Sequence, residues 1–230
     1  MLRPILPFLV FMIVTFPLCA QHWIGSVGLN YGSYSMKSLK KVQQSLFPSN
    51  IPLEVVESFP SRAGFEINLL RTFDNLSFGA GFSQASTGGR VSYADYSGSI
   101  VHDIIANNTL ISIQIEYAFL RKDSWELFFA MRNGIAVSTM KYRTALTLGT
   151  ETDEIKNKFK AMNFALSPGL GARFFYRNFF LHPEARYETH IVKGDLTYTE
   201  DSDVELKVNG NKVQMDWDGI RLSISLGYRI

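Results

Sequence analysis

The chain lacks the cysteines that would cross-link a small exported domain. Cys19 is the only cysteine in its 230 residues, so the chain after it forms no disulfide bond and offers no thiol for catalysis or zinc binding. No sign of charge dominates either, because 23 Lys and Arg residues stand against 21 Asp and Glu residues. This balance gives no reason to expect a nucleic-acid partner.

Long apolar runs are also missing after the first twenty residues. Arg3, the apolar run over 5–18 and the small residue Ala20 predict a signal peptide over residues 1–20 and a mature domain over residues 21–230. An uncleaved anchor and lipid attachment at Cys19 are the alternatives. The run is short and interrupted by proline for an anchor, and beyond it nothing approaches the roughly 20 apolar residues of a membrane helix.

The chain is rich instead in alternation with a period of two. From Ile220 to Ile230 every second residue is apolar, and the residues between are Arg, Ser or Gly. Successive side chains of a strand point to opposite faces, so one face is apolar and the other polar or small. The same pattern predicts seven further strands, near residues 22–34, 61–73, 76–86, 109–121, 124–140, 160–176 and 179–192.

The predicted connections alternate between short and long. Tight turns are expected at 74–75, 122–123 and 177–178, and long polar loops at about 35–60, 87–108, 141–159 and 193–212. Short turns at one end and long loops at the other are typical of bacterial outer-membrane barrels. Aromatic residues cluster near the short turns (Trp23, Phe73, Phe119, Trp125, Tyr176, Phe179 and Tyr228) and toward the loops (Tyr31, Tyr142, Tyr187 and Tyr198), as in interfacial girdles.

Two folds compete for this pattern, a membrane barrel and a soluble barrel or sandwich. The apolar face is bulky on every strand and no second layer is available to cover it in water. We therefore predict an all-β fold: a closed antiparallel transmembrane β-barrel of about eight strands, with short periplasmic turns, long extracellular loops and one short helix in the first loop. A polar network is expected inside, made of Glu66, Glu116, Glu126, Arg132, Arg173, His182, Glu184, Arg186, Glu188 and Arg221.

Several residues break the regular pattern. Pro168 and Pro183 fall inside predicted strands and cannot donate to a β-ladder, so we expect bulges or a kink there. The pair at 133–134 (Asn-Gly) is expected to mark another bulge. Arg71 falls on the apolar face close to a turn, where a long side chain can reach the interface.

The loops hold the remaining candidates. Helical spacing from Met36 to Phe47 predicts an amphipathic helix, with Ser35 as its cap and Pro48 at its end. We expect it to pack over the barrel mouth; the alternative is a helix lying on anionic lipid headgroups. The second loop offers binding candidates that combine charge with tyrosine, namely Arg90, Tyr93, Asp95 and Tyr96.

Catalytic and metal signals are weak. The acidic stretch 200–203 lacks the ligand spacing of a calcium loop, and the sequence predicts no metal site and no cofactor. His182, Glu184 and His190 are weak catalytic candidates on one strand face, and 102–103 (His-Asp) is a second weak pair. Because paired charges inside a barrel use the same residue types, we predict that the chain is not an enzyme. Eight strands also leave no wide channel.

The strand and loop pattern resembles that of the small outer-membrane β-barrels of Gram-negative bacteria, such as the OmpA-like group and the wider porin family. The stretch 86–98, with its Gly-Gly-Arg and Asp-Tyr-Ser-Gly, is similar to barrels common in Bacteroidota. The C-terminal strand resembles their assembly signal, although Ile230 stands where Phe is usual. The resemblance implies an outer-membrane location, with outer-membrane lipid and the barrel-assembly machinery as partners.

The resemblance assigns no catalytic residues. We therefore expect a structural or surface-interaction role, in which the loops meet a protein or glycan partner. A lipid-modifying or proteolytic barrel enzyme is the first alternative, and a subunit of a secretion or assembly machine is the second.

Overall fold

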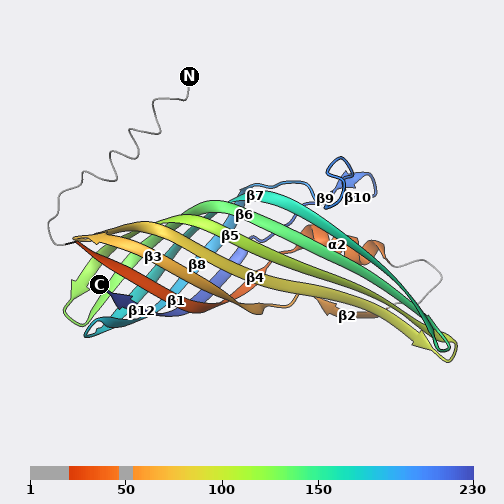
Figure 1. Ribbon diagram of the computed structural model, residues 1–230, viewed down its shortest axis with the longest axis horizontal. Helices are drawn as coiled ribbons and strands as arrows, with labels where there is room; N and C mark the ends of the chain where they lie inside the picture. Colours follow the sequence, from red (N-terminus) through yellow and green to blue (C-terminus); the bar gives the residue numbers. More distant parts are fainter. Residues whose placement is uncertain (1–20, 47–53) are drawn as a thin grey trace, which may run out of the picture.

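The computed structural model describes residues 21–46 and 54–230, and its main element is a closed ring of eight antiparallel strands (Figure 1). Each ring strand pairs with both neighbours, in the order β4-β3-β1-β12-β8-β7-β6-β5 and back to β4. The predicted signal peptide and the predicted end of the helix, Phe47 and Pro48, lie outside the described residues. The ring strands are β1 (Gln21–Tyr34), β3 (Arg62–Phe73), β4 (Leu76–Asp95), β5 (Gly98–Lys122), β6 (Trp125–Leu148), β7 (Glu151–Tyr176), β8 (Phe179–Val192) and β12 (Gly219–Arg229).

The apolar face of the ring strands points outward. On β7, Phe174, Leu170, Phe164 and Met162 are between 42% and 65% exposed, and all lie on the same face. At about 3.3 Å per residue and a tilt near 45°, this run spans roughly 28 Å, close to the apolar band of a membrane barrel. The predicted fold class is therefore confirmed: the chain is a closed antiparallel β-barrel with an apolar exterior.

The short turns lie together at one end of the barrel, as predicted, at 74–75, 123–124 and 177–178. The second turn is one residue later than expected. Asp74 and Arg177 adopt left-handed backbone angles, with φ of 49° and 57°, which tight turns require. Among the described residues, no helix has the length and apolar character that crossing a membrane requires.

Two of the predicted long loops are not loops. The β4–β5 ladder continues without a register shift to Asp95↔Gly98, and the β6–β7 ladder continues to Leu148↔Glu151. The four strands thus run past the ring as a sheet, and β2 (Glu54–Ser58) pairs with β4 at its edge. We call the rows beyond the ring (85–95, 98–108, 138–148 and 151–161) the extension sheet; they reach furthest from the short turns in Figure 1.

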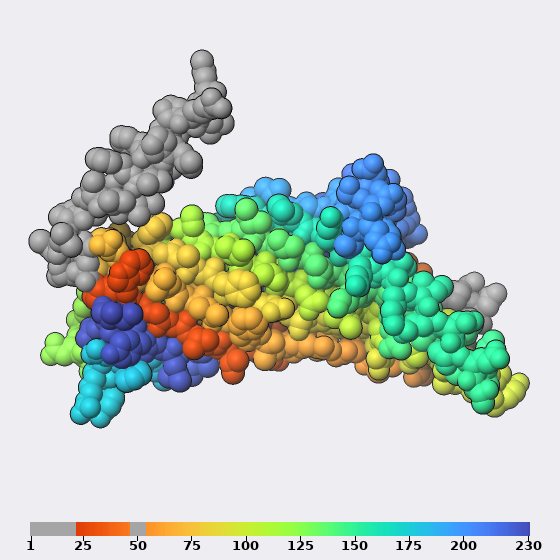
Figure 2. All heavy atoms as spheres, in the orientation of Figure 1, coloured from red at the N-terminus to blue at the C-terminus, as the bar shows by residue number. Residues whose placement is uncertain are grey.

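A cap covers the inner face of the extension sheet. The cap consists of α2 (Lys37–Ser45) and the segment 193–218, which contains the short strands β9 (Thr197–Tyr198), β10 (Lys207–Val208) and β11 (Asn211–Lys212). In Figure 2 part of this segment stands out as a blue bulge on one side of the molecule. Its apolar side chains pack with those of the sheet in one buried cluster that includes Met36, Leu39, Val42, Ile104, Met140, Leu196, Val213, Met215 and Trp217.

The cap shows that one prediction about the helix is wrong, namely its N-cap, and confirms another, its packing over the barrel mouth. Ser35 does not cap it: Met36 occupies that position, and the carboxylate of Asp216 accepts hydrogen bonds from the Ser38 backbone N–H and hydroxyl at 2.9 and 2.7 Å. Leu39 and Val42 are buried against the sheet, so the helix packs over the mouth and presents no apolar face to lipid. Tyr142 likewise packs against this cluster rather than in an outer girdle.

No register shift falls at Pro168, Pro183 or Gly134, where the sequence predicts bulges, although the β7–β8 ladder shifts its register between Phe164 and Ala165. Pro168 pairs in register with Met131, and Pro183 with Ile224. The β7–β8 ladder has two gaps in which residues are not paired. One gap is 167–168 opposite 187–188, and the other is 172–173 opposite 182–183. The register is the same on both sides of each gap. The prolines therefore interrupt pairing without adding a residue. The register is also continuous at Gly134, where a Cβ would lie 2.1 Å from the Ile111 carbonyl oxygen, so glycine there permits close strand approach.

Candidate functional site

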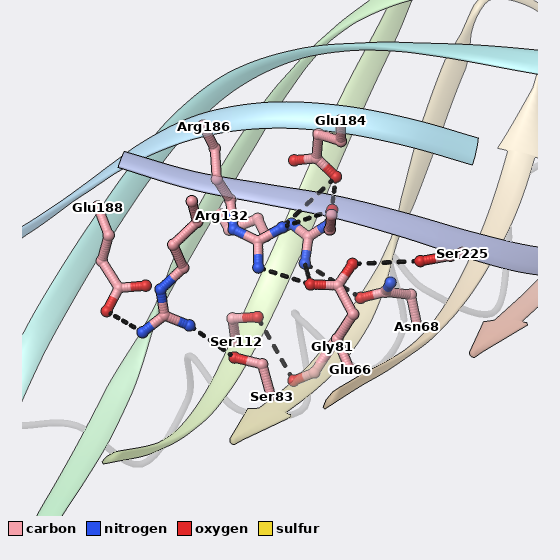
Figure 3. A network of polar contacts seen from close by, with 12 residues as sticks. Glu66, Asn68, Gly81, Ser83, Ser112, Arg132, Glu184, Arg186, Glu188 and Ser225 are labelled. Carbon is pink, nitrogen blue, oxygen red and sulfur yellow. Dashed lines mark hydrogen bonds and ion pairs between the residues drawn. The ribbon is translucent and has the colours of Figure 1, made fainter. Parts of the chain in front are cut away.

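The barrel interior holds all ten side chains of the predicted polar network. Each is at most 4% exposed, although each lies on a strand whose other face is apolar. Carboxylates and guanidiniums from different strands meet across the interior (Figure 3). Because a buried charge is costly unless it is paired and hydrogen-bonded, the pairing pattern decides whether this interior is stable.

The middle of the interior contains two carboxylates and two guanidiniums. Arg186 donates to Glu66 at 2.6 Å, and Arg132 lies 3.6 Å from the same carboxylate. Arg132 also donates to Glu184, which lies 3.4 Å from His182 Nε2. The four residues come from β3, β6 and β8, so their contacts cross the barrel. Figure 3 shows the two guanidiniums between the two carboxylates.

A second group lies toward the short turns. Arg173 donates to Glu126 at 2.6 Å and to Glu116. Arg121, which the sequence analysis did not include, donates from Nε to Glu126 at 2.9 Å. Its guanidinium is partly exposed at the barrel rim. An Arg next to a turn gives no sequence signal of this role, because its direction depends on the turn geometry.

A third group lies toward the extension sheet. Arg221 donates to Glu188 at 2.7 Å, and its guanidinium lies over the ring of Tyr34 at 5.2 Å. His190 Nε2 is 3.2 Å from the Glu188 carboxylate, and the Asn108 amide reaches the same oxygen at 3.4 Å. The middle group and the group toward the short turns each contain two carboxylates and two guanidiniums, and the third group contains one of each. Each group therefore forms a layer that is neutral when both histidines are uncharged.

The weak catalytic candidates are enclosed by this network. His182, Glu184 and His190 are between 2% and 4% exposed and sit among the paired charges. The second weak pair is separated by the pleat: His102 faces inward and contacts the hydroxyls of Thr144 and Tyr142, while Asp103 faces outward and binds Arg90. Among the described residues, no group of His, Cys, Asp and Glu is arranged to hold a metal ion.

The loop binding candidates lie in the β4–β5 hairpin rather than in a loop. Arg90 makes a two-bond contact with Asp103 at 2.6 and 3.1 Å. Asp95 closes the hairpin turn, because its carboxylate accepts hydrogen bonds from Ser97 and the Gly98 N–H. The Ser97 hydrogen bonds lower the pKa of Asp95. Tyr93 donates to Asp95 at 3.1 Å, and Tyr96 is fully exposed at the tip.

A polar cluster that the sequence analysis missed fixes the cap to the barrel. Lys193 binds Asp216 at 3.0 Å and Asp218 at 2.5 Å. Asp218 also accepts the backbone N–H of His190 at 2.7 Å, and Asp216 caps α2 through Ser38. The alternation over 213–218, with apolar residues at 213, 215 and 217, is the available signal, and it lies just after the predicted loop over 193–212.

No protein-family model and no curated protein sequence matches the chain. Solved structures do resemble it, among them the following three. Ail, the attachment invasion locus protein of Yersinia pestis, is 12% identical with a TM-score of 0.41, over 91% of this chain and 99% of that one. Neisserial surface protein A is 12% identical with a TM-score of 0.40, over 90% of this chain and 96% of that one. The outer membrane protease OmpT from Escherichia coli is 9% identical with a TM-score of 0.38, over 94% of this chain and 99% of that one.

Proposed function

We propose that the chain is a Gram-negative outer-membrane barrel whose extension sheet and cap make contact with molecules outside the cell. The apolar band around the ring supports the membrane location, because so large an exposed apolar surface is stable in lipid and not in water. The proposal includes export directed by the signal peptide predicted over residues 1–20. It also includes membership of the OmpA-like group or of the Bacteroidota barrels.

One observation carries the contact role. Strands β4 to β7 continue about ten residues beyond the ring as a hydrogen-bonded sheet, and this sheet has its own buried core with the cap. Closing a barrel requires no such unit. The barrel interior, in contrast, contains neutral layers of paired charge, which favours a supporting role for the barrel and a contact surface at the extended end.

The enzyme alternative requires substrate to reach the interior histidines. His182 and His190 are at most 3% exposed, and their carboxylate neighbours already bind arginine. A lipid-modifying or proteolytic reaction at these residues therefore needs the barrel to open. A subunit role in a secretion or assembly machine needs a stable protein partner, which the experiment below also detects.

The orientation is tested by labelling with a membrane-impermeant maleimide on intact cells. In a Cys19→Ser background, Tyr96→Cys places a thiol at the tip of the extension sheet and Asn75→Cys places one in a short turn. We expect label on Tyr96→Cys in intact cells, and on Asn75→Cys only after the cells are broken. The reverse pattern would refute the proposed orientation.

The contact role is tested by photo-crosslinking in the same cells. A benzophenone amino acid at Val56 or Tyr96, both exposed on the extension, is compared with one at Leu226, which is 67% exposed on the apolar band. We expect a protein or glycan adduct of defined mass from the two extension positions and lipid adducts alone from Leu226. Absence of a discrete adduct from either extension position contradicts the contact role.

A further inference from the structure

A group of lysines stands at the upper edge of the apolar band on β6 and β7. On the outward face of β7 the exposed Met162 is followed by Lys160, Lys158 and Lys156, all of them exposed. On β6 the exposed Val137 is followed, after Thr139, by Lys141. These lysines share the face of the apolar residues, so they lie where lipid headgroups meet the barrel.

Two of these lysines are directly opposite each other. Lys141 pairs in register with Lys158 across the β6–β7 ladder. Like charges that face each other on one side of a sheet destabilise it. The next outward pair, Arg143 and Lys156, is also basic, but Glu154 forms ion pairs with both of its members.

Lys141, Lys158 and Lys160 have no such compensation. None of the three forms an ion pair with an acid of the described residues, whereas Lys193, Lys207 and Lys212 all do. No acid of the described residues therefore contacts either member of the Lys141–Lys158 pair. An anion from outside the chain that sits between the two ammonium groups removes their repulsion.

The lysines are also confined to one side of the barrel. In the row of Lys160 the outward residues on β6, β5 and β4 are Thr139, Asn107 and Ser86, none of them charged. Polar residues are expected above the apolar band of any membrane barrel, and uncharged residues would be enough for that. They do not explain why three cations without an ion-pair partner lie on two neighbouring strands. Ile105, 45% exposed and in register with Lys141, adds an apolar contact beside them.

We infer that Lys141, Lys158 and Lys160 bind the phosphate groups of an anionic lipid in the leaflet next to the extension sheet. The geometry favours a lipid over a dissolved anion, because the three lysines continue the outward faces of β6 and β7 beyond apolar side chains that would contact its acyl chains. The inference rests on the proposed membrane location. To that location it adds the side of the barrel at which the lipid binds and the class of headgroup that is bound.

The test uses the full mature chain in nanodiscs of phosphatidylcholine mixed with phosphatidic acid, with bound lipid measured by native mass spectrometry. We expect retained phosphatidic acid to be enriched in the unmodified chain. The enrichment should fall by up to roughly a hundredfold in Lys141→Gln/Lys158→Gln/Lys160→Gln, since each lysine near an anionic surface contributes on the order of a fivefold preference. The matched control, Lys37→Gln/Lys40→Gln/Lys41→Gln, removes the same charge from α2 and should keep the enrichment.

A second variant separates ligand binding from folding. Lys158→Glu replaces a like-charge pair by an opposite-charge pair with Lys141, so its thermal midpoint in neutral detergent should equal or exceed that of the unmodified chain. In phosphatidic acid nanodiscs its midpoint should instead be the lower of the two. If the order of the two thermal midpoints is the same in detergent and in phosphatidic acid nanodiscs, the inference is overturned.

Two further outcomes are distinguishable. Failure of the unmodified chain to insert into nanodiscs would refute the proposed membrane location itself. Insertion without phosphatidic acid enrichment would refute only the lysine site. Loss of the enrichment on addition of millimolar inorganic phosphate would indicate a site for dissolved phosphate and would also overturn the lipid assignment.

Discussion

At the residue scale, the interior depends on charges that are matched within each layer. Arg221 and Glu188 illustrate this, because they are 1% and 0% exposed and form the only carboxylate–guanidinium pair described in their layer. A buried ion pair adds little net stability relative to apolar residues, but removal of one partner leaves an unpaired buried charge. Single and paired substitutions should therefore differ strongly.

We predict that Arg221→Met lowers the free energy of unfolding by about 3–5 kcal/mol. Addition of Glu188→Gln to that variant should restore at least half of the loss, because the uncompensated carboxylate is gone and the amide can still bond His190. Urea titration in detergent micelles, followed by the difference in gel migration between folded and boiled protein, measures both. Arg177→Met, in an exposed turn, is the control and should change little. Additive losses in the double variant would contradict a matched pair.

At the element scale, the sequence predicted the lipid-facing strands well and the extension sheet poorly. Inside the band the outward residues are apolar with few exceptions, such as Asn133, so the period of two is unmistakable. Beyond it that requirement ends: Ile104 faces the cap, its neighbour Ile105 faces outward, and the alternation disappears. The continuous strands of the extension sheet were therefore predicted as polar loops.

The interior network was also predictable, because charged residues on the polar face of a closed barrel have only each other as partners. The cap was not predictable in the same way. Its key contacts join residues far apart in the chain, such as Ser38 and Asp216, and no local pattern reports them. Ser35 was the better helix cap by sequence alone, yet its hydroxyl donates to the Asp216 carbonyl instead.

The Asp216 cap gives a prediction about pH. Burial raises the pKa of this carboxyl, but hydrogen bonds from Ser38 and the ion pair with Lys193 outweigh burial and hold the pKa below its ordinary value. A carboxyl with a depressed folded-state pKa stabilises the fold above its unfolded pKa of about 3.9, and the contribution is lost as the pH falls through the folded value. The cap should therefore loosen below about pH 4.

Trp217, buried in the cap, provides the measurement after Trp23→Phe and Trp125→Phe remove the other tryptophans. We expect its emission to shift to the red below about pH 4 while the barrel stays folded. Asp216→Asn should lower the free energy of cap opening at pH 7 by about 1–2 kcal/mol, as for loss of a helix cap, and this difference should shrink at pH 3. Asp153→Asn, exposed on the extension sheet, is the control, and an equal effect from it would refute the assignment.

At the scale of the whole molecule, the chain consists of two differently stabilised parts that share four strands. The ring presents apolar residues outward and encloses paired charges. The extension sheet reverses this order, with polar residues outside and an apolar core beneath the cap. Because the layers of the ring are neutral by themselves and the core of the cap lies above them, the ring should not need the upper rows of the extension to fold.

The last prediction tests that independence by shortening both hairpins. Replacement of residues 90–103 by Asn-Gly joins Gly89 to Ile104, and the same replacement of 143–156 joins Tyr142 to Asn157; both junctions connect residues that already pair in register. Asn-Gly suits a two-residue hairpin turn. We expect the shortened chain to keep its heat-modifiable migration, with a thermal midpoint within a few degrees of the full chain, because every ion pair of the interior lies below the cuts. It should also lose the adducts expected from the extension. Failure of the shortened chain to form a heat-modifiable barrel, under conditions where Arg177→Met does form one, would mean that the extension is needed to close the ring.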